Sequence, residues 1–228
     1  MITANEKIDM NEKKNLTLKE TFALAVQNHQ KNNLKVAENL YNKVLKIDST
    51  HVEANNNLGI IFDKLGQPKK AIRYFQKAIQ IKPDYADAYY NLGKIFNELN
   101  EHQKAISYYE KAIQINSNQA DVHNNLGVIF KNLGESKKAI SCYKKAVKID
   151  PNYVNAYNNL GTILGELNRI KEAKKNFEKS LSLDQNKKET NEGYGNIILK
   201  FNHHDKALSY IRKGTGFIRF TQKDFKII

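Results

Sequence analysis

Four copies of the tripeptide Asn-Leu-Gly follow one another along this chain at a constant interval of 34 residues. They begin at Asn57, Asn91, Asn125 and Asn159. A constant period of this length is typical of stacked units, in which each unit covers its apolar face with its neighbours instead of building a separate globular core. The period therefore predicts a repeat architecture, and it favours an interaction scaffold over an enzyme.

Other positions keep the same period around the tripeptide. Each glycine is followed by an alanine, then by an aromatic residue, then by a second small residue. These rows are Ala71, Ala105, Ala139 and Ala173; Phe75, Tyr109, Tyr143 and Phe177; and Ala78, Ala112, Ala146 and Ser180. With Pro83 and Pro151 closing two of the units, this frame resembles the tetratricopeptide repeat over residues 18–221. The resemblance implies a right-handed superhelix of two-helix hairpins.

The spacing of apolar residues predicts the same elements without the resemblance. They recur at intervals of three and four, which is the pattern of one stripe on an α-helix. First helices are expected near residues 52–65, 86–99, 120–133 and 154–167. A glycine inside such a helix costs about 1 kcal/mol relative to alanine, so close packing of the two helices is expected beside it. Helix-ending residues with a left-handed backbone are expected at the turns, namely Gly66, Asn100, Gly134, Asn168 and Asn202.

The predicted fold class is all-α, a right-handed α-solenoid of about six helix-turn-helix repeats. Residues 1–17 are polar and are expected to be disordered, and the capping-box pattern of Thr17 and Glu20 starts the first helix near residue 18. Residues 222–228 form an apolar tail of strand-like composition. The repeats within the 18–221 solenoid are predicted at 18–51, 52–85, 86–119, 120–153 and 154–187, with a degenerate last repeat at 188–221.

The net charge of +13 raises the question of nucleic-acid binding. Lysines recur at one position of the second helices, which the resemblance places on the outer surface: Lys77, Lys111, Lys145 and Lys179. A charge row in that position is typical of a solvated face, and no basic groove with interleaved aromatic residues accompanies it. No specific nucleic-acid binding is therefore expected.

The sequence offers no motif for chemistry. The six histidines do not pair at metal-ligand spacing, and no nucleophile motif or phosphate-binding loop occurs. We therefore predict no catalytic residues, no metal and no cofactor. The absence of a long apolar stretch argues against membrane insertion. Together with the single Cys142 and the lack of a signal-peptide core, it favours a cytoplasmic location. The oligomeric state stays open.

One polar strip is the candidate binding face. The asparagine row turns away from the apolar stripe of the first helices, and the resemblance places these helices on the concave wall. A row of side-chain amides can hold a peptide backbone without selecting its side chains, and it resembles the asparagine ladder of O-GlcNAc transferases. The candidate peptide-binding residues are Asn57, Asn91, Asn125, Asn159, Lys94, Asp87 and Asp121.

Acidic residues outnumber basic ones along this strip, which favours a neutral or basic extended segment as the ligand. Two alternatives stay open: the asparagines bond to neighbouring repeats or to water, and the carboxylates in first turns serve the helix dipole.

The function predicted from this face is a non-catalytic scaffold or adaptor that binds an extended peptide segment of a partner protein. The alternative is the substrate-recruiting arm of a protein-modifying enzyme, such as a glycosyltransferase, whose catalytic domain is absent from this chain. A catalytic domain following Ile228 in the natural protein would favour the alternative. The sequence names neither the partner nor the pathway.

Overall fold

The computed structural model describes residues 16–201, 203–215, 219–220 and 225–226. These residues are almost entirely helical. The chain separates into two compact units, and the boundary along the sequence falls between Glu101 and His102. The predicted disordered segment lies outside the described residues, apart from its last two positions, and so does most of the predicted tail.

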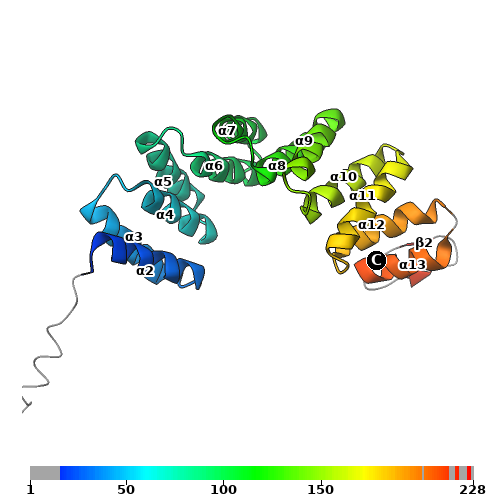
Figure 1. Cartoon of the computed structure of the whole chain (residues 1–228), viewed down its shortest axis with the longest axis horizontal. Helices are drawn as coiled ribbons and strands as arrows, with labels where there is room; N and C mark the ends of the chain where they lie inside the picture. Colours follow the sequence, from blue (N-terminus) through cyan, green and yellow to red (C-terminus); the bar gives the residue numbers. More distant parts are fainter. Residues whose placement is uncertain (1–15, 202, 216–218, 221–224, 227–228) are drawn as a thin grey trace, which may run out of the picture. The chain divides into compact units, whose positions relative to one another are not determined.

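The first unit is built from two hairpins and one further helix (Figure 1). In each hairpin the two helices pack along each other, and each second helix also packs on the first helix of the next repeat. The helices are α2 (Leu18–Gln30), α3 (Leu34–Ile47), α4 (Val52–Lys64), α5 (Pro68–Ile81) and α6 (Ala86–Glu98). Helix α6 is a first helix, and it also packs on the preceding first helix, α4.

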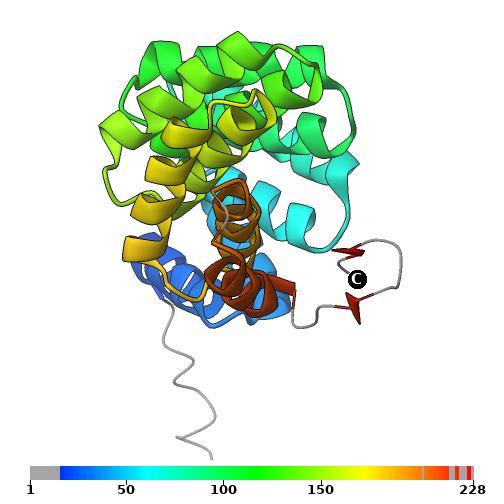
Figure 2. The ribbon, with the colours of Figure 1, turned by 90° about the vertical axis from the view of Figure 1, so that its right-hand side faces the viewer.

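The second unit starts with a single helix and continues with three hairpins, of which the last is drawn in orange to red in Figure 2. The first helices α8, α10 and α12 pack in series, and each second helix packs on the first helix of the next repeat. The helices are α7 (His102–Ile115), α8 (Ala120–Asn132), α9 (Ser136–Ile149), α10 (Val154–Glu166), α11 (Ile170–Leu183), α12 (Lys188–Leu199) and α13 (His204–Thr215).

A short antiparallel pair follows the last helix. Strand β1 (Arg219–Phe220) pairs with β2 (Phe225–Lys226), with Arg219 opposite Lys226 and Phe220 opposite Phe225. Aromatic side chains are enriched in strands, so the strand-like composition of this region agrees with its backbone.

The four predicted first helices are confirmed, each ending one residue earlier than expected. The turns also follow the prediction. Gly66 and Gly134 have φ of 67° and 76°, and Asn100 and Asn168 have φ of 59° and 57°. Asn32 adopts the same conformation at the equivalent turn of the first hairpin, with φ of 60°, whereas Asn202 lies outside the described residues. Glycine and asparagine tolerate this left-handed geometry better than other residues.

The glycines inside the first helices are required by the packing of each hairpin. A Cβ atom on Gly59 would lie 2.5 Å from the ring of Phe75, and one on Gly127 would lie 2.5 Å from the ring of Tyr143. Both rings are about 1% exposed, so they have no open space into which to move. Each aromatic ring therefore fills the position that a side chain on the facing glycine would take, and the expected close packing is confirmed at these positions.

The first helix of the chain is capped as the sequence predicts. Thr17 Oγ1 accepts a hydrogen bond from the backbone N–H of Glu20 at 3.2 Å, and the Glu20 carboxylate accepts one from the backbone N–H of Thr17 at 2.9 Å. Replacing Thr17 with alanine should lower the unfolding free energy by about 1 kcal/mol. Chemical denaturation followed by circular dichroism measures this loss, and an unchanged midpoint would show that the cap contributes nothing.

Candidate functional site

The asparagine row begins in the first unit on α4 and α6. Asn57 and Asn91 are both half-buried. The Nδ2 group of Asn57 donates to the hydroxyl of Tyr41 at 3.1 Å, and that of Asn91 donates to Oδ1 of Asn56 at 3.1 Å. Both bonds reach back to the preceding repeat.

The second unit repeats the arrangement on α8 and α10. Asn125 donates to the Tyr109 hydroxyl at 3.4 Å, and Asn159 donates to Oδ1 of Asn124 at 3.0 Å. Both residues are again half-buried. Bonding to the preceding repeat was one of the two alternatives that the sequence left open, and the structure shows it at all four positions.

The row keeps hydrogen-bonding capacity beyond these contacts. A side-chain amide has two N–H donors and a carbonyl oxygen with two lone pairs, and only one N–H of each asparagine is used in the bonds described above. Within the described residues, the amide oxygens of Asn57, Asn91 and Asn159 accept no hydrogen bond. These three asparagines therefore have a structural role and an open acceptor at the same time, whereas the amide oxygen of Asn125 accepts a bond from Asn124 at 3.5 Å.

The charged residues predicted to accompany the row differ in their surroundings. Asp87 and Asp121 are exposed in the first turns of α6 and α8, and Asp121 accepts a hydrogen bond from the hydroxyl of Tyr153. Lys94 is half-buried and forms an ion pair with Asp63 at 3.7 Å. Asp121 and Lys94 therefore already contact side chains of this chain.

Asp87 also contributes to the electrostatics around Tyr85, the residue before α6. Burial raises the pKa of the Tyr85 hydroxyl to about 12, and the carboxylates of Asp87 and Glu53 act in the same direction. Negative charge from two successive repeats therefore acts on one tyrosine, which agrees with the acidic strip expected from the sequence.

A second set of features lies among the second helices, where the sequence predicted only a solvated charge row. Among the described residues of the second unit, three hollows lie at equivalent positions of successive repeats. They have volumes of about 590, 450 and 460 Å³ and lie between α7 and α9, between α9 and α11, and between α11 and α13. We call them the first, second and third hollow. The signal that could have located them is the lysine period, because Lys145, Lys179 and Lys213 each line one hollow.

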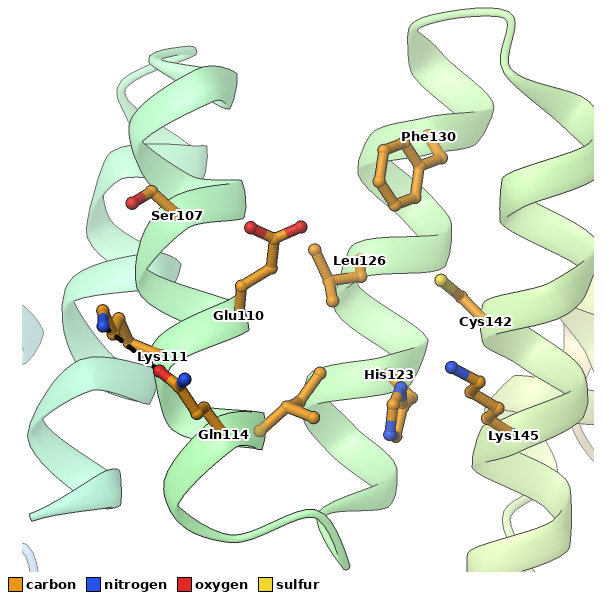
Figure 3. Close-up of a pocket in the computed structure, with 10 residues that line it drawn as sticks. Ser107, Glu110, Lys111, Gln114, His123, Leu126, Phe130, Cys142 and Lys145 are labelled. Carbon is orange, nitrogen blue, oxygen red and sulfur yellow. Dashed lines mark hydrogen bonds between the residues drawn. The ribbon is translucent and has the colours of Figure 1, made fainter. Parts of the chain in front are cut away.

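Figure 3 shows the first hollow. Helix α7 contributes Glu110 and Lys111, whereas α8 contributes His123 and Leu126 and α9 contributes Cys142 and Lys145 to the lining. The Cys142 thiol is partly exposed, and burial raises its pKa. A raised pKa leaves little thiolate at neutral pH, so the thiol is less nucleophilic than a free cysteine.

His123 gives the second unit a pH dependence. It is 6% exposed, and burial lowers its pKa below 6.5, as does the charge of Lys145, whereas a hydrogen bond with the Ser117 backbone acts in the opposite direction. Below about pH 6.5 the unfolded chain therefore binds more protons at His123 than the folded chain does, so the contribution of this residue to stability falls as the pH falls. We expect the melting temperature to decrease from pH 7 to pH 5, and the His123→Gln variant to lose part of that decrease. An identical decrease in the variant would contradict this assignment.

Two further searches bear on function. Among residues 16–201, 203–215, 219–220 and 225–226, no cluster of three or more histidine, cysteine or acidic side chains is placed to hold a metal ion. Within the same residues, every helix is too short or too polar to cross a membrane.

Comparisons with known proteins agree with the repeat geometry. Family models described as tetratricopeptide repeat match residues 52–85, 86–119 and 120–153, and a second such model matches residues 142–175. No match was found among curated proteins.

Several solved structures have the same fold. The crystal structure of MamA is 32% identical, with a TM-score of 0.63, over 71% of this chain and 94% of MamA. PilF of Pseudomonas aeruginosa has a TM-score of 0.79 at 19% identity, over 85% of this chain and 88% of PilF. YrrB, described as a TPR protein with an unusual peptide-binding site, has a TM-score of 0.63 at 20% identity, over 77% of this chain and 91% of YrrB.

The paired helices, the left-handed turns and the glycine–aromatic contacts define a helical-repeat protein of the kind that binds other proteins. The chain belongs to the tetratricopeptide repeat family, as its match to the family models and its 32% identity to MamA show. The predicted all-α class with about six helix-turn-helix repeats is confirmed, and the fold supports a protein-interaction scaffold.

Proposed function

We propose that this protein is a non-catalytic scaffold in which the asparagine face of the first helices of each unit holds an extended segment of a partner protein. The observation that supports this most directly is the half-buried asparagine row. Its amide N–H groups are fixed by the preceding repeat, while the amide oxygens of Asn57, Asn91 and Asn159 stay open within the described residues. An amide held in one orientation loses little side-chain entropy when it accepts a bond from a ligand.

The orientation of the amides specifies what the ligand must offer. Open carbonyl oxygens accept hydrogen bonds, and an extended peptide presents backbone N–H groups at regular intervals. The exposed carboxylates of Asp87 and Asp121 on the same helices favour a neutral or basic segment over an acidic one. YrrB, which has the same fold, is described as having a peptide-binding site, and this description supports the proposal.

The test replaces the asparagines and measures binding of peptides selected on the intact chain from a displayed library of random twelve-residue sequences. The variant with alanine at Asn57, Asn91, Asn125 and Asn159 should bind the neutral or basic selected peptides at least tenfold more weakly. Each lost hydrogen bond contributes about 0.5–1.5 kcal/mol, and about 1.4 kcal/mol corresponds to a factor of ten in affinity.

The structural role of the same asparagines requires a matched control. The double variant Tyr41→Phe and Tyr109→Phe removes the acceptors of Asn57 and Asn125 but leaves all four amides in place. It should lower the melting temperature and weaken peptide binding by only about two- to threefold, because every amide remains and two of them lose the bond that fixes their orientation. Full affinity in the quadruple alanine variant, or equal affinity losses in the alanine and phenylalanine variants, would overturn the proposal.

A further inference from the structure

The three hollows of the second unit arise from the way its helices pack. Helix α9 packs on α10 and α11 packs on α12, whereas the second helices α9 and α11, both fully described, are not packed against each other. The space between successive second helices is therefore open at the surface, and the intervening first helix forms its floor. The same geometry recurs because the sequence repeats. The hollows therefore form a row in which each hollow is displaced from the previous one by one repeat.

The floors of the hollows are apolar or aromatic. Leu126 and Phe130 line the first hollow, Leu160 and Leu164 the second, and Tyr194 the third. Volumes of about 450–590 Å³ fall within the range of small ligand sites. Each hollow therefore has room for one or two apolar side chains of a partner.

The walls of the hollows carry lysines that form no ion pair within the described residues. Within the described residues, no carboxylate lies within ion-pair distance of Lys144, Lys145, Lys175 or Lys179, and all four lysines are exposed. Two acidic side chains in the same row are already occupied. Glu172 accepts two bonds from Arg169 at 2.7 and 2.8 Å, and Glu178 accepts one from the Tyr194 hydroxyl at 2.9 Å.

We propose that this row of hollows is a second binding surface, which takes an acidic segment of a partner protein. The carboxylates of the segment lie against Lys145, Lys179 and Lys213, and its apolar side chains enter the hollows. This surface is formed by the second helices, so it is independent of the asparagine face and has the opposite charge preference.

A protein segment fits this surface better than a nucleic acid does. Glu110 and Glu178 occupy equivalent positions in the walls of the first and third hollows. They would repel a nucleic acid, which carries a phosphate at every nucleotide, whereas a peptide can place an uncharged residue opposite each glutamate. The floors of the first two hollows contain Leu126, Leu160 and Leu164 beside the rings of His123, Phe130 and Tyr157, and aliphatic carbon is a poorer platform for stacking bases than an aromatic face. These floors match the apolar side chains that alternate with carboxylates in an acidic peptide.

The experiment compares two charge-reversal variants with the same net charge. The hollow variant carries K144E, K145E, K175E and K179E. The control variant carries K137E, K171E, K188E and K206E, whose lysines are exposed and do not line a hollow. Peptides are selected on the intact chain from the random twelve-residue library, and their affinities are measured by fluorescence anisotropy at physiological ionic strength.

The selected peptides should include a class rich in aspartate, glutamate and apolar residues. This class should bind the hollow variant at least tenfold more weakly, bind the control variant within about twofold, and bind the quadruple asparagine variant as tightly as the unchanged chain. If the hollow variant does not fold, the lysine-to-glutamine version of the same four changes replaces it, with the same expected order.

Three results would overturn the proposal. They are the absence of an acidic class among the selected peptides, equal losses in the hollow and control variants, and tighter binding of a twelve-nucleotide RNA that depends on the same four lysines. The last result would assign the surface to nucleic acid.

Discussion

Replacing Gly127 with leucine is expected to lower the unfolding free energy of the second unit by about 3 kcal/mol or more. The new Cβ atom would lie 2.5 and 2.7 Å from two ring atoms of Tyr143, which is 1% exposed. Overpacking of this kind costs about 1–3 kcal/mol for a few added methylenes, and a leucine adds four carbon atoms. The gain in helix propensity, about 1 kcal/mol relative to glycine, offsets only part of this loss.

Urea denaturation followed by circular dichroism measures the effect. Lys111→Ala is the matched control, because Lys111 is exposed on the neighbouring helix α7 and should change stability by less than about 0.5 kcal/mol. A second comparison locates the clash. The double variant Gly127→Ala and Tyr143→Leu should lose less stability than the two single changes added together, since the smaller side chain makes room for the new methyl group. Additive losses would show that Gly127 and Tyr143 do not limit each other.

The architecture of each unit was predictable from the sequence because the repeat itself carries the information. The first helices show the apolar spacing of an amphipathic helix, and each described turn between the two helices of a repeat has glycine or asparagine where the backbone becomes left-handed. The glycine opposite the aromatic residue was predictable for the same reason. A glycine in mid-helix is unfavourable, so its recurrence indicates a contact that excludes a side chain.

The candidate site was predictable only in part. The helical period places Asn57 and Asn125 on one face of their helices, but it does not reveal that their amides donate to tyrosine hydroxyls sixteen residues earlier. Such a bond depends on how far a tyrosine reaches across the boundary between repeats, which no local pattern encodes. The hollows were missed for a similar reason. The lysine row was visible, but the space beside it depends on the separation of helices that do not pack against each other.

Replacing Phe177 with alanine is expected to destabilise the second unit by about 3–5 kcal/mol, the usual cost of deleting a buried aromatic ring. Phe177 is 2% exposed and lies between two first helices. A Cβ atom on Gly161 of α10 would lie 2.9 Å from the ring, and one on Gly193 of α12 would lie 2.7 Å from it. Deleting the ring therefore leaves a cavity beside two residues without side chains, and neither can fill it.

Because the ring contacts two successive repeats, its loss should weaken the association of these repeats as well as the packing of the two helices within one hairpin. Lys179→Ala is the control, since Lys179 lies two residues further along α11, is exposed, and should leave the melting temperature nearly unchanged. Phe177→Leu should retain part of the stability, because leucine fills part of the same volume. A loss below about 1 kcal/mol in the alanine variant would mean that α10 and α12 close over the cavity. In that case the glycine–aromatic contacts would guide the register of the repeats without holding them together.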